Sequence, residues 1–384
     1  MIIGFDAKRA FQNKTGLGNY SRTLLYSLNE YFEQHQYILF TPKQTLLFNT
    51  NEMPSAKVIT PAWQPAKLLS SVWRSKWITH DLKKAGLHVY HGLSNEIPAG
   101  MRKTGIPSVV TIHDLIFEHY PQQYDKGEVL VYRKKFRYAC KQADAIIATS
   151  LHTKKDIIDI YNIRPDKIHV CYQSCNQAYA QKLSSAQLSQ IQKQYNLPET
   201  YFLYVGSIIE RKNLLLICQA LKLLKSKLPI PLVVVGEGKA YKEKVKQWLT
   251  QHDLLNEVIF LSDTDTAKHS RDYQNGSHFP AIYQNALALI YPSIYEGFGI
   301  PVLEALTSGI PVIAARSSSL PEVGGDAVLY FTPNDVAGLC DCMLQIALDD
   351  ETRQQCIQNA ARHVLNFTQQ KCAESVMKVY QALM

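Results

Sequence analysis

Short apolar runs alternate with longer amphipathic stretches along the chain. The first series of runs includes MIIGF, VVTIHDLIF, AIIATS and IHVCY, and a second series follows with YFLYVGS, LVVVG, VIFLS, ALIYPS and PVIAA. Parallel strands joined by crossover helices have this pattern, because a strand covered on both faces is a continuous apolar run. The sequence therefore predicts an α/β protein with two doubly wound, parallel-sheet domains.

The domain boundaries follow from the break between the two series. A polar stretch over residues 173–197, followed by Pro198, separates them and is the predicted linker. We expect an N-terminal domain over residues 1–180 and a C-terminal domain over residues 181–366, with the last helices near 350–365 and 367–383. A chain of 384 residues is long enough for two domains that each bury a full core.

The composition is that of a folded protein, with 46% hydrophobic and 19% charged residues. No apolar run approaches the ~18 residues of a membrane span, and the start MIIGFDAKRA soon turns polar, so we expect no signal peptide, no membrane anchor and a cytoplasmic location. The eight cysteines form no paired CxxC motifs, so we expect neither a disulfide framework nor a metal site.

The net charge of +8 is unevenly distributed. Residues 1–180 carry 23 Lys and Arg against 14 Asp and Glu, whereas residues 181–384 carry 18 against 19. The excess in the first half favours a phosphate-bearing substrate, an acidic membrane surface or nucleic acid as a partner, or it is an ordinary solvated surface. Nucleic acid is the weakest of these interpretations, because no recognised motif interleaves the cations with exposed aromatic residues.

One basic segment, Trp63 to Lys84, suggests a membrane contact. On a helix, Leu69, Trp73 and Trp77 form one apolar stripe, which is bordered by the cations Lys67, Arg74, Lys76, Lys83 and Lys84. Such a stripe can lie in an anionic membrane interface and would suit a lipid-linked acceptor. The alternative is that the stripe is the core face of a helix packed under the sheet.

Two strand ends in the first half carry candidate ligand-binding residues, because ligands of parallel sheets bind beyond the carboxyl ends of the strands. Gly16 and Gly18, in KTGLGNY, allow close backbone approach before a helix start that favours an anion, although a plain turn is the alternative. His113 and Asp114 follow a strongly apolar strand and can hydrogen-bond a sugar hydroxyl or a phosphate. The alternative for His113 is a loop histidine bonded to a neighbouring carbonyl.

The first strand of the second half is followed by Gly206 and, shortly afterwards, by Arg211 and Lys212. Two cations at a helix start oppose the helix dipole. A bound diphosphate would explain this mismatch, because guanidinium and ammonium groups offset its charge. A solvated charged turn is the alternative.

The segment YEGFGIPVLEA combines two carboxylates with a glycine-rich loop. Glu296 is expected in the loop and Glu304 about one turn into the helix that Pro301 begins. Carboxylates beside the exposed amides of Gly297, Phe298 and Gly299 can hold the hydroxyls of a ligand whose phosphates lie at the helix N-terminus.

EGFGIPVLE resembles the E-x7-E motif of the retaining glycosyltransferases of family 4, which have the GT-B architecture of two facing Rossmann-like domains. The segments GLGNY, VYHGLSNEIP, TIHDLIF, VGSIIERKN and ALIYPS resemble further segments of that family in the expected order. The resemblance implies an N-terminal acceptor domain and a C-terminal nucleotide-sugar donor domain. It also implies that the C-terminal helix, residues 367–384, packs back on the first domain.

The resemblance also implies site residues. Arg211 and Lys212 would bind the donor diphosphate, Glu296 the hydroxyls of the donor sugar and Glu304 the ribose. Gly16 would support the phosphate from the opposite domain, and His113 would face the transferred sugar. The other donor-binding residues implied are Gly18, Gly206, Ser262, Gly297, Phe298 and Gly299, and the acceptor-side candidates are His91, Asn95 and Asp114.

Two segments depart from the family pattern. Residues 262–278 are longer and more polar than the usual link into the next helix, which leaves base recognition near Leu261 and Ser262 open. Phe367-Thr368-Gln369-Gln370 replaces the usual aromatic-acidic start of the last helix, a change that we expect to be structural.

The function implied is retaining transfer of a hexose, without metal or cofactor, to a glycan or lipid-diphosphate-linked sugar in bacterial-type polysaccharide or glycoconjugate synthesis. GDP-mannose is the first expectation for the donor and a UDP-hexose the second. No DxD-like metal pair marks the donor half, and the Arg-Lys pair can replace a cation. The alternatives are a sugar-nucleotide epimerase, a glycosyl phosphorylase with pyridoxal phosphate, and a non-catalytic sugar-nucleotide-binding protein.

Overall fold

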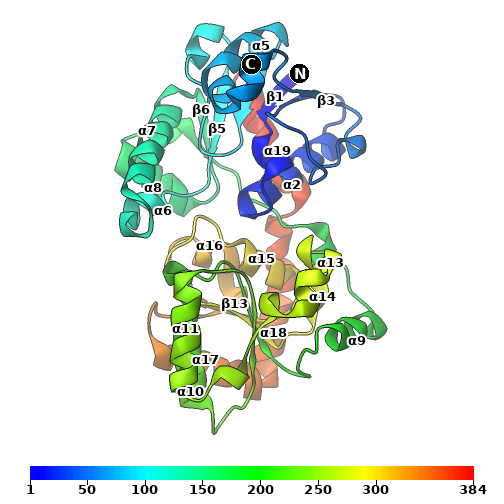
Figure 1. Cartoon of the computed structure of the whole chain (residues 1–384), viewed down its shortest axis with the longest axis vertical. Helices are drawn as coiled ribbons and strands as arrows, with labels where there is room; N and C mark the ends of the chain where they lie inside the picture. The colour runs from blue at the N-terminus through cyan, green and yellow to red at the C-terminus, as the bar shows by residue number, and fades with distance from the viewer. The chain divides into compact units, whose positions relative to one another are not determined.

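In the computed structural model, which describes residues 1–384, the chain forms two compact units (Figure 1). The first comprises Met1–Cys175 and Phe367–Met384, and the second comprises Asn176–Asn366. Each unit contains one entirely parallel sheet with helices against it. The predicted class, two doubly wound α/β domains, is therefore confirmed.

The first unit has seven strands in the order β3-β2-β1-β4-β5-β6-β7. They are β1 (Ile2–Asp6), β2 (Gln36–Phe40), β3 (Ala56–Ile59), β4 (Val89–Gly92), β5 (Ser108–Ile112), β6 (Ala145–Ala148) and β7 (Ile168–Val170). Its helices are α1 (Lys8–Gln12), α2 (Gly16–Tyr31), α3 (Gln64–Leu68), α4 (Ser70–Val72), α5 (Ile78–Lys84), α6 (Ile116–His119), α7 (Lys126–Gln142), α8 (Leu151–Tyr161) and α19 (Gln369–Gln381).

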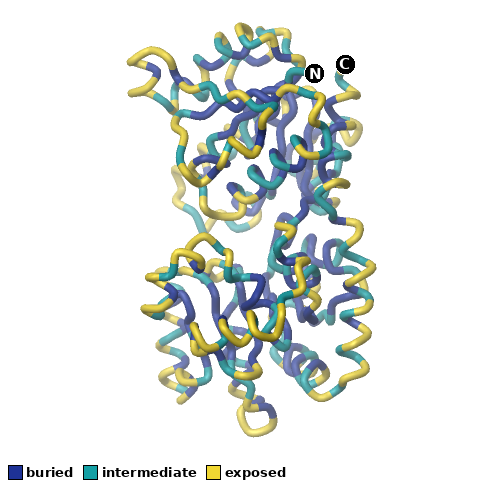
Figure 2. The backbone as a smooth tube through the Cα atoms, turned by 90° about the vertical axis from the view of Figure 1, so that its right-hand side faces the viewer, coloured by how far each residue is buried: buried dark blue, intermediate teal, exposed yellow.

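Side chains pack on both faces of the first sheet. Neighbouring residues of one strand point to opposite faces, and Val109 of β5 accordingly packs in a cluster with Phe5, whereas Val110 packs in another cluster with Tyr90. Figure 2 shows the resulting pattern, with buried strands inside and exposed residues mainly on loops and the outer turns of helices. A sheet covered on both faces explains why its strands read as continuous apolar runs.

The C-terminal helix α19 packs against α2 of the first unit, and the two ends of the chain lie near one another in this unit (Figure 1). Its Val376, Met377 and Tyr380 are buried in the cluster that contains Phe5. The predicted return of this helix to the first domain is therefore confirmed. Its unusual start has a structural role, because the side chain of Thr368 caps the helix by accepting from the Lys371 amide.

The second unit has six strands in the order β10-β9-β8-β11-β12-β13. This is the doubly wound order in which the chain reverses direction across the sheet between β8 and β11, so the carboxyl ends of these two strands flank the crevice where ligands bind. The strands are β8 (Phe202–Val205), β9 (Leu232–Val235), β10 (Val258–Phe260), β11 (Ala288–Tyr291), β12 (Val312–Ala315) and β13 (Val328–Phe331).

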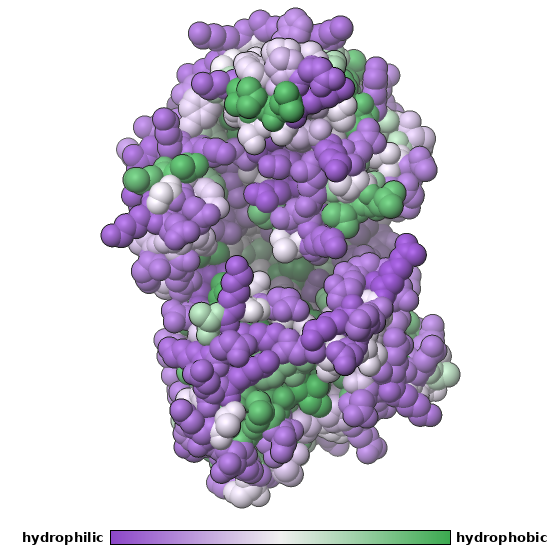
Figure 3. All heavy atoms as spheres, viewed as in Figure 1, coloured by the Kyte–Doolittle hydropathy of each residue, from purple (hydrophilic) through white to green (hydrophobic).

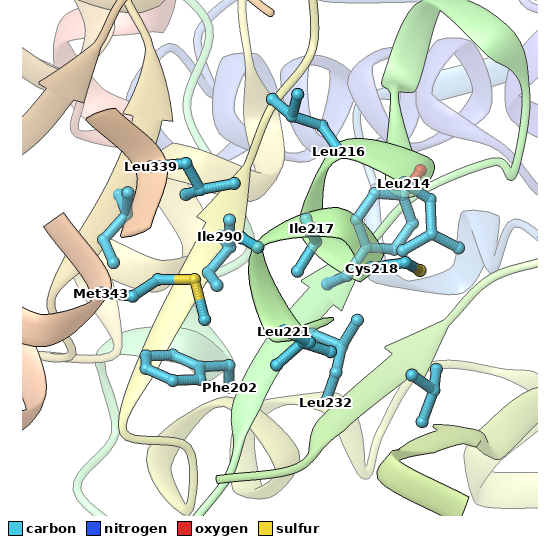
Figure 4. Close-up of a cluster of buried hydrophobic side chains, with 14 of the residues drawn as sticks. Phe202, Leu214, Leu216, Ile217, Cys218, Leu221, Leu232, Ile290, Leu339 and Met343 are labelled. Atoms are coloured by element: carbon cyan, nitrogen blue, oxygen red, sulfur yellow. The ribbon is translucent and has the colours of Figure 1, made fainter. Parts of the chain in front are cut away.

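The helices of the second unit are α9 (Ser185–Gln194), α10 (Leu214–Leu224), α11 (Ala240–Gln251), α12 (Asp265–His269), α13 (Arg271–Gln274), α14 (Phe279–Gln284), α15 (Ile300–Thr307), α16 (Leu320–Gly324), α17 (Val336–Leu348) and α18 (Asp350–His363). Most of the predicted linker, 173–197, thus belongs to this unit and includes α9. Figure 4 shows how Ile217 of α10, Ile290 of β11 and Met343 of α17 pack together under this sheet. This core fixes the strand ends that carry the candidate site.

The predicted amphipathic helix between Trp63 and Lys84 is wrong. The segment is divided into α3, α4, a π-helical turn over Trp73–Trp77, and α5. A π-helical turn takes more residues than an α-helical one and breaks the i, i+4, i+8 alignment. The chain also leaves helical geometry at Leu69, where α3 ends with φ −101° and ψ 48°. Leu69 is 52% exposed, whereas Trp73 is 1% exposed.

Trp73 and Arg74 are packed inside the first unit, whereas Leu69 is exposed. The Trp73 indole donates to Asp81 Oδ2 at 2.7 Å. Arg74 is not a surface cation, because it donates to Asp6 through Nε at 2.8 Å and pairs with Glu96. The proposed membrane anchor therefore does not form in the predicted way. Hydrophilic residues cover most of the face seen in Figure 3, and no helix is long and apolar enough to span a membrane.

Candidate active site

Arg211 and Lys212 lie at the switch point of the second sheet, in a single helical turn between β8 and α10. β8 is followed by Gly206, whose φ of +148° is one that residues with a side chain rarely adopt. A Cβ at Gly206 would lie 3.9 Å from the Lys212 side chain, so the loop and the lysine are close. Arg211 and Lys212 thus lie in a separate helical turn, Glu210–Lys212, before α10 begins. The Arg211 side chain is only 7% exposed.

Glu296, in the loop after β11, binds both cations. Its Oε1 lies 3.0 Å from Arg211 Nη1 and 2.6 Å from Lys212 Nζ. The same oxygen accepts from the hydroxyls of Tyr291, at 3.2 Å, and Ser293. All four of these contacts reach Oε1, which leaves Oε2 to accept hydrogen bonds from a ligand.

The Glu296 carboxyl is ionised despite its burial. Burial alone would raise its pKa, but Lys212 and Arg211, with the hydrogen bonds from Lys212 and Ser293, lower that pKa to about 2. A buried charge is tolerated only when it is paired and hydrogen-bonded. The structure thus brings together Arg211, Lys212 and Glu296, which the sequence analysis placed in one site.

Three consecutive serines after β12 hold the Glu296 loop. The Ser318 hydroxyl accepts from the Glu296 amide at 2.7 Å, and the Ser319 hydroxyl donates to the Glu296 carbonyl at 2.9 Å. Ser317 donates to the Ser293 carbonyl at 2.7 Å. These serines were not predicted from the sequence, although the run RSSSL directly after a strand was a usable signal.

Gly299 forms the start of α15 as the sequence predicts. Its φ is +119°, and a Cβ there would lie 2.8 Å from Leu320, so the position requires glycine. Pro301 lies in the first turn of the helix. Gly297, Phe298 and Gly299 therefore lead directly into a helix N-terminus next to Glu296, where an anion would be stabilised. Their binding of a phosphate stays a prediction.

Glu304 lies further along α15 and has a different environment. Tyr283 of α14 donates to its Oε2 at 2.8 Å, and Tyr179 donates a second hydrogen bond. Burial raises the pKa of Glu304 to about 7, although the two tyrosine hydrogen bonds oppose that rise. Neither tyrosine was predicted from the sequence, because no local motif connects them with Glu304.

Ser262 lies in the helical turn Leu261–Asp263 directly after β10 and is 7% exposed. Its hydroxyl oxygen accepts from the Gly236 amide at 3.0 Å and lies 2.7 Å from the Tyr273 hydroxyl. The polar segment 262–278 thus folds as the short helices α12 and α13 and bonds back to the strand ends. A role for Ser262 in binding the donor stays a prediction.

In the first unit, His113 lies directly after β5. Its amide donates to Asn95 Oδ1 at 2.9 Å, and its Nε2 lies 2.9 Å from the Leu93 carbonyl. A carbonyl can only accept, so Nε2 carries the proton and Nδ1 is the acceptor. Burial lowers the pKa of His113 to about 4, so the imidazole is neutral. The edge of the Tyr20 ring packs on it at a centroid distance of 4.6 Å.

Two other predicted sites lie in the same unit, Asp114 just after β5 and the two glycines in the first turn of α2. Asp114, next to His113, accepts from the Ile116 amide at 3.1 Å, just before α6. Gly18 lies where a Cβ would approach the Asn13 carbonyl oxygen to 1.9 Å, whereas Gly16 is open to solvent. The backbone at Gly18 therefore requires glycine for its own packing, and the role of Gly16 toward a ligand stays a prediction.

The structure corrects the prediction for His91. This side chain is fully buried. Its Nδ1 lies 2.6 Å from the Tyr380 hydroxyl and its Nε2 lies 2.8 Å from Thr111 Oγ1. Burial, with a smaller effect from His113, lowers its pKa to about 3. His91 is a core residue that bonds to α19, and it is not an acceptor-side candidate.

Two family models match most of the chain. The model for Glycosyltransferase Family 4 matches residues 15–176, within the first unit, and the model for Glycosyl transferases group 1 matches residues 187–363, within the second. The chain belongs to this glycosyltransferase family. Its two Rossmann-like units with the returning C-terminal helix are the GT-B fold of the family.

Related proteins agree with this assignment. The chain is 28% identical to the O-antigen chain mannosyltransferase B of Escherichia coli over 81% of this chain and 77% of that protein. It is also 28% identical to the O-antigen chain mannosyltransferase RfbU of Salmonella typhimurium, over 59% of this chain and 57% of that protein.

Solved glycosyltransferase structures share the fold. A glycosyltransferase from Rickettsia africae superposes with a TM-score of 0.74 at 18% identity, over 100% of this chain and 98% of that one. HepE of Anabaena, solved with UDP and glucose, has a TM-score of 0.74 at 16% identity, over 99% of both chains.

Proposed function

We propose that this glycosyltransferase transfers mannose from GDP-mannose, with retention of configuration and without a metal ion. The carrying observation is the Arg211–Lys212–Glu296 cluster at the switch point of the second sheet, next to the N-terminus of α15. The two mannosyltransferase relatives support the choice of sugar. A UDP-hexose is the second candidate, because structures of the similarly folded HepE contain UDP-glucose or UDP.

In the proposed donor site, three sets of groups bind three parts of the donor. Arg211, Lys212 and the first amides of α15 lie against the diphosphate, Oε2 of Glu296 accepts from a sugar hydroxyl, and Glu304 accepts from the ribose. The diphosphate gains negative charge as it leaves, and fixed cations lower the barrier most when they stabilise charge that develops in the transition state. Two fixed cations can supply this stabilisation without a metal ion.

Retention requires that the acceptor oxygen arrives on the face that the diphosphate leaves. The bond from the anomeric carbon to the phosphate oxygen breaks, the bond to the acceptor hydroxyl oxygen forms, and the departing phosphate takes the hydroxyl proton. This route avoids a covalent enzyme intermediate. It fits Glu296, whose Oε1 is occupied by two cations and two hydroxyls and whose charge is thereby neutralised.

The first unit supplies the proposed acceptor side. His113 Nδ1 is an acceptor for a hydroxyl of the transferred sugar, and Asn95 and Asp114 lie beside it. The basic balance of the first half suits a glycan or lipid-diphosphate-linked sugar acceptor. A peripheral membrane contact stays a prediction, now without the tryptophan stripe on which it depended.

A thermal-shift panel of nucleotides and nucleotide sugars tests this function. A donor at 100 times its dissociation constant is expected to add about 2.7 kcal/mol of stability. We expect the largest rise in melting temperature with GDP-mannose and GDP, and smaller rises with the uridine series. The absence of a rise with every nucleotide sugar would contradict the proposal, and donor turnover without an acceptor would indicate an epimerase.

A further inference from the structure

The two carboxylates of the candidate donor site are held in opposite ways. Glu296 is held by two cations, whereas Glu304 makes no ion pair and is held by the hydroxyls of Tyr179 and Tyr283. A neutral donor stabilises a carboxylate less than a cation does. The Glu304 carboxylate therefore has these two hydrogen bonds, and no cation, to offset the cost of its burial.

The two tyrosines come from different parts of the second unit. Tyr283 lies on α14, and Tyr179 lies in the turn Gln177–Ala180, which packs against α15. Their rings meet edge to face with centroids 5.3 Å apart, and Tyr283 is 1% exposed. Each ring restricts the other, so both hydroxyls reach Glu304 from fixed positions. A carboxylate has about four acceptor sites, so the two hydroxyls leave room for ribose hydroxyls.

We propose that Tyr179 and Tyr283 are positioning residues that favour the ionised form of the Glu304 carboxylate and orient it toward the ribose of the bound nucleotide, so that donor affinity is linked to one proton on Glu304. The proposal rests on the ribose-binding role of Glu304 in the proposed function. It adds two residues that no sequence motif connects with the donor site.

Few side chains shift the pKa of the Glu304 carboxyl. The two that do are Tyr283 of α14 and Tyr179 of the turn Gln177–Ala180. β11 contributes Tyr291, which raises the pKa of Tyr283 and is not among the groups that shift the pKa of Glu304. The other elements that pack against α15 contribute no charged or titratable group that shifts the pKa of Glu304; they are α16, β12, α18 and the turn Val364–Asn366. The proton linkage therefore belongs to Glu304 and its two tyrosines.

The sign of the linkage follows from which form binds the ribose. Ribose hydroxyls donate to the ionised carboxylate, so nucleotide affinity rises with pH through the Glu304 pKa of about 7 and levels off above it. Removing a tyrosine hydroxyl removes a hydrogen bond to the ionised form and raises that pKa further. Affinity at neutral pH then falls, and it recovers when the pH is raised.

The test measures the dissociation constant of GDP-mannose by calorimetry, from about pH 6 to about pH 9, a range that brackets the shifted titration. The variants are Tyr283→Phe, Tyr179→Phe and Glu304→Gln. Tyr201→Phe is the matched control, because Tyr201 is equally buried and donates to the Ile282 carbonyl beside Tyr283 without contacting Glu304. If GDP-mannose does not bind, the same series uses the nucleotide sugar that stabilises the chain most.

We expect Glu304→Gln to bind at least tenfold more weakly above neutral pH, without the rise in affinity that wild type shows. Each Tyr→Phe variant should move the midpoint of that rise upward by about one pH unit, which is a tenfold change in proton affinity, and approach wild-type affinity at the highest pH. Tyr201→Phe should keep the wild-type midpoint.

The outcomes separate the two hypotheses. Wild-type affinity in Glu304→Gln at every pH would remove the ribose role of Glu304, and with it the proposed assignment of the donor site. Weak binding in Glu304→Gln together with an unmoved midpoint in both Tyr→Phe variants would overturn the positioning role alone. A loss of affinity in the tyrosine variants that high pH does not reverse would likewise contradict proton linkage.

Discussion

Arg211→Ala is expected to lower turnover by about 10²–10³-fold, the range found when one preorganised electrostatic contact is removed from comparable sites. Arg211 is almost fully buried beside Glu296, so its guanidinium is fixed before the diphosphate begins to leave. Lys212→Ala is expected to have a similar effect. In each variant the remaining cation still pairs with Glu296, so the fold should be retained.

Steady-state kinetics and the melting temperature test this prediction together. The matched control is Arg362→Ala, because Arg362 is exposed on α18 and bonds only to Asn359 on the same helix. Its turnover should equal that of wild type. Near-normal turnover in both Arg211→Ala and Lys212→Ala would contradict the electrostatic account of catalysis.

Glu296→Gln is expected to lower turnover by about 10²–10³-fold while nucleoside diphosphate binds as tightly as before or more tightly. The substitution keeps the shape of the side chain but removes its charge. Arg211 and Lys212 then lack their carboxylate and attract a diphosphate more strongly. The contact to the transferred sugar is weakened at the same time. Turnover therefore falls, whereas the affinity for the product nucleotide does not.

The control for this variant is Glu351→Gln, because Glu351 is exposed in the first turn of α18. Glu351→Gln should keep wild-type turnover, and its free energy of unfolding should fall by no more than the few tenths of a kcal/mol typical of a surface charge near a helix end. Turnover near the wild-type value in Glu296→Gln would show that Glu296 does not contact the transferred sugar. Weaker nucleoside diphosphate binding would show that Glu296 helps to bind the phosphates.

The sequence predicted the residues whose positions depend on the sheet itself. Arg211 and Glu296 follow two different apolar runs, and the carboxyl ends of parallel strands lie on one edge, so their meeting needed no knowledge of side-chain packing. Gly299 and Pro301 were also predictable without knowledge of packing, because the backbone at the start of a helix favours glycine before the first turn and proline within it.

The residues that the sequence did not predict depend on packing between distant segments. Tyr179 and Glu304 are far apart in the chain and meet because one turn packs against α15. His91 looked like a strand-end ligand, but α19 returns from the end of the chain and buries it. The predicted apolar stripe assumed regular α-helical spacing, which the π-helical turn at Trp73–Trp77 does not have.

The central claim is that Arg211, Lys212, Glu296 and Glu304 form the donor site. A crystal structure of the protein with bound GDP, or with the nucleoside diphosphate that stabilises it most, tests this claim most directly. The account predicts diphosphate oxygens within hydrogen-bonding distance of Arg211 and Lys212, and a ribose hydroxyl on the Glu304 carboxylate. A nucleotide bound elsewhere, or a diphosphate that touches neither cation, would contradict it.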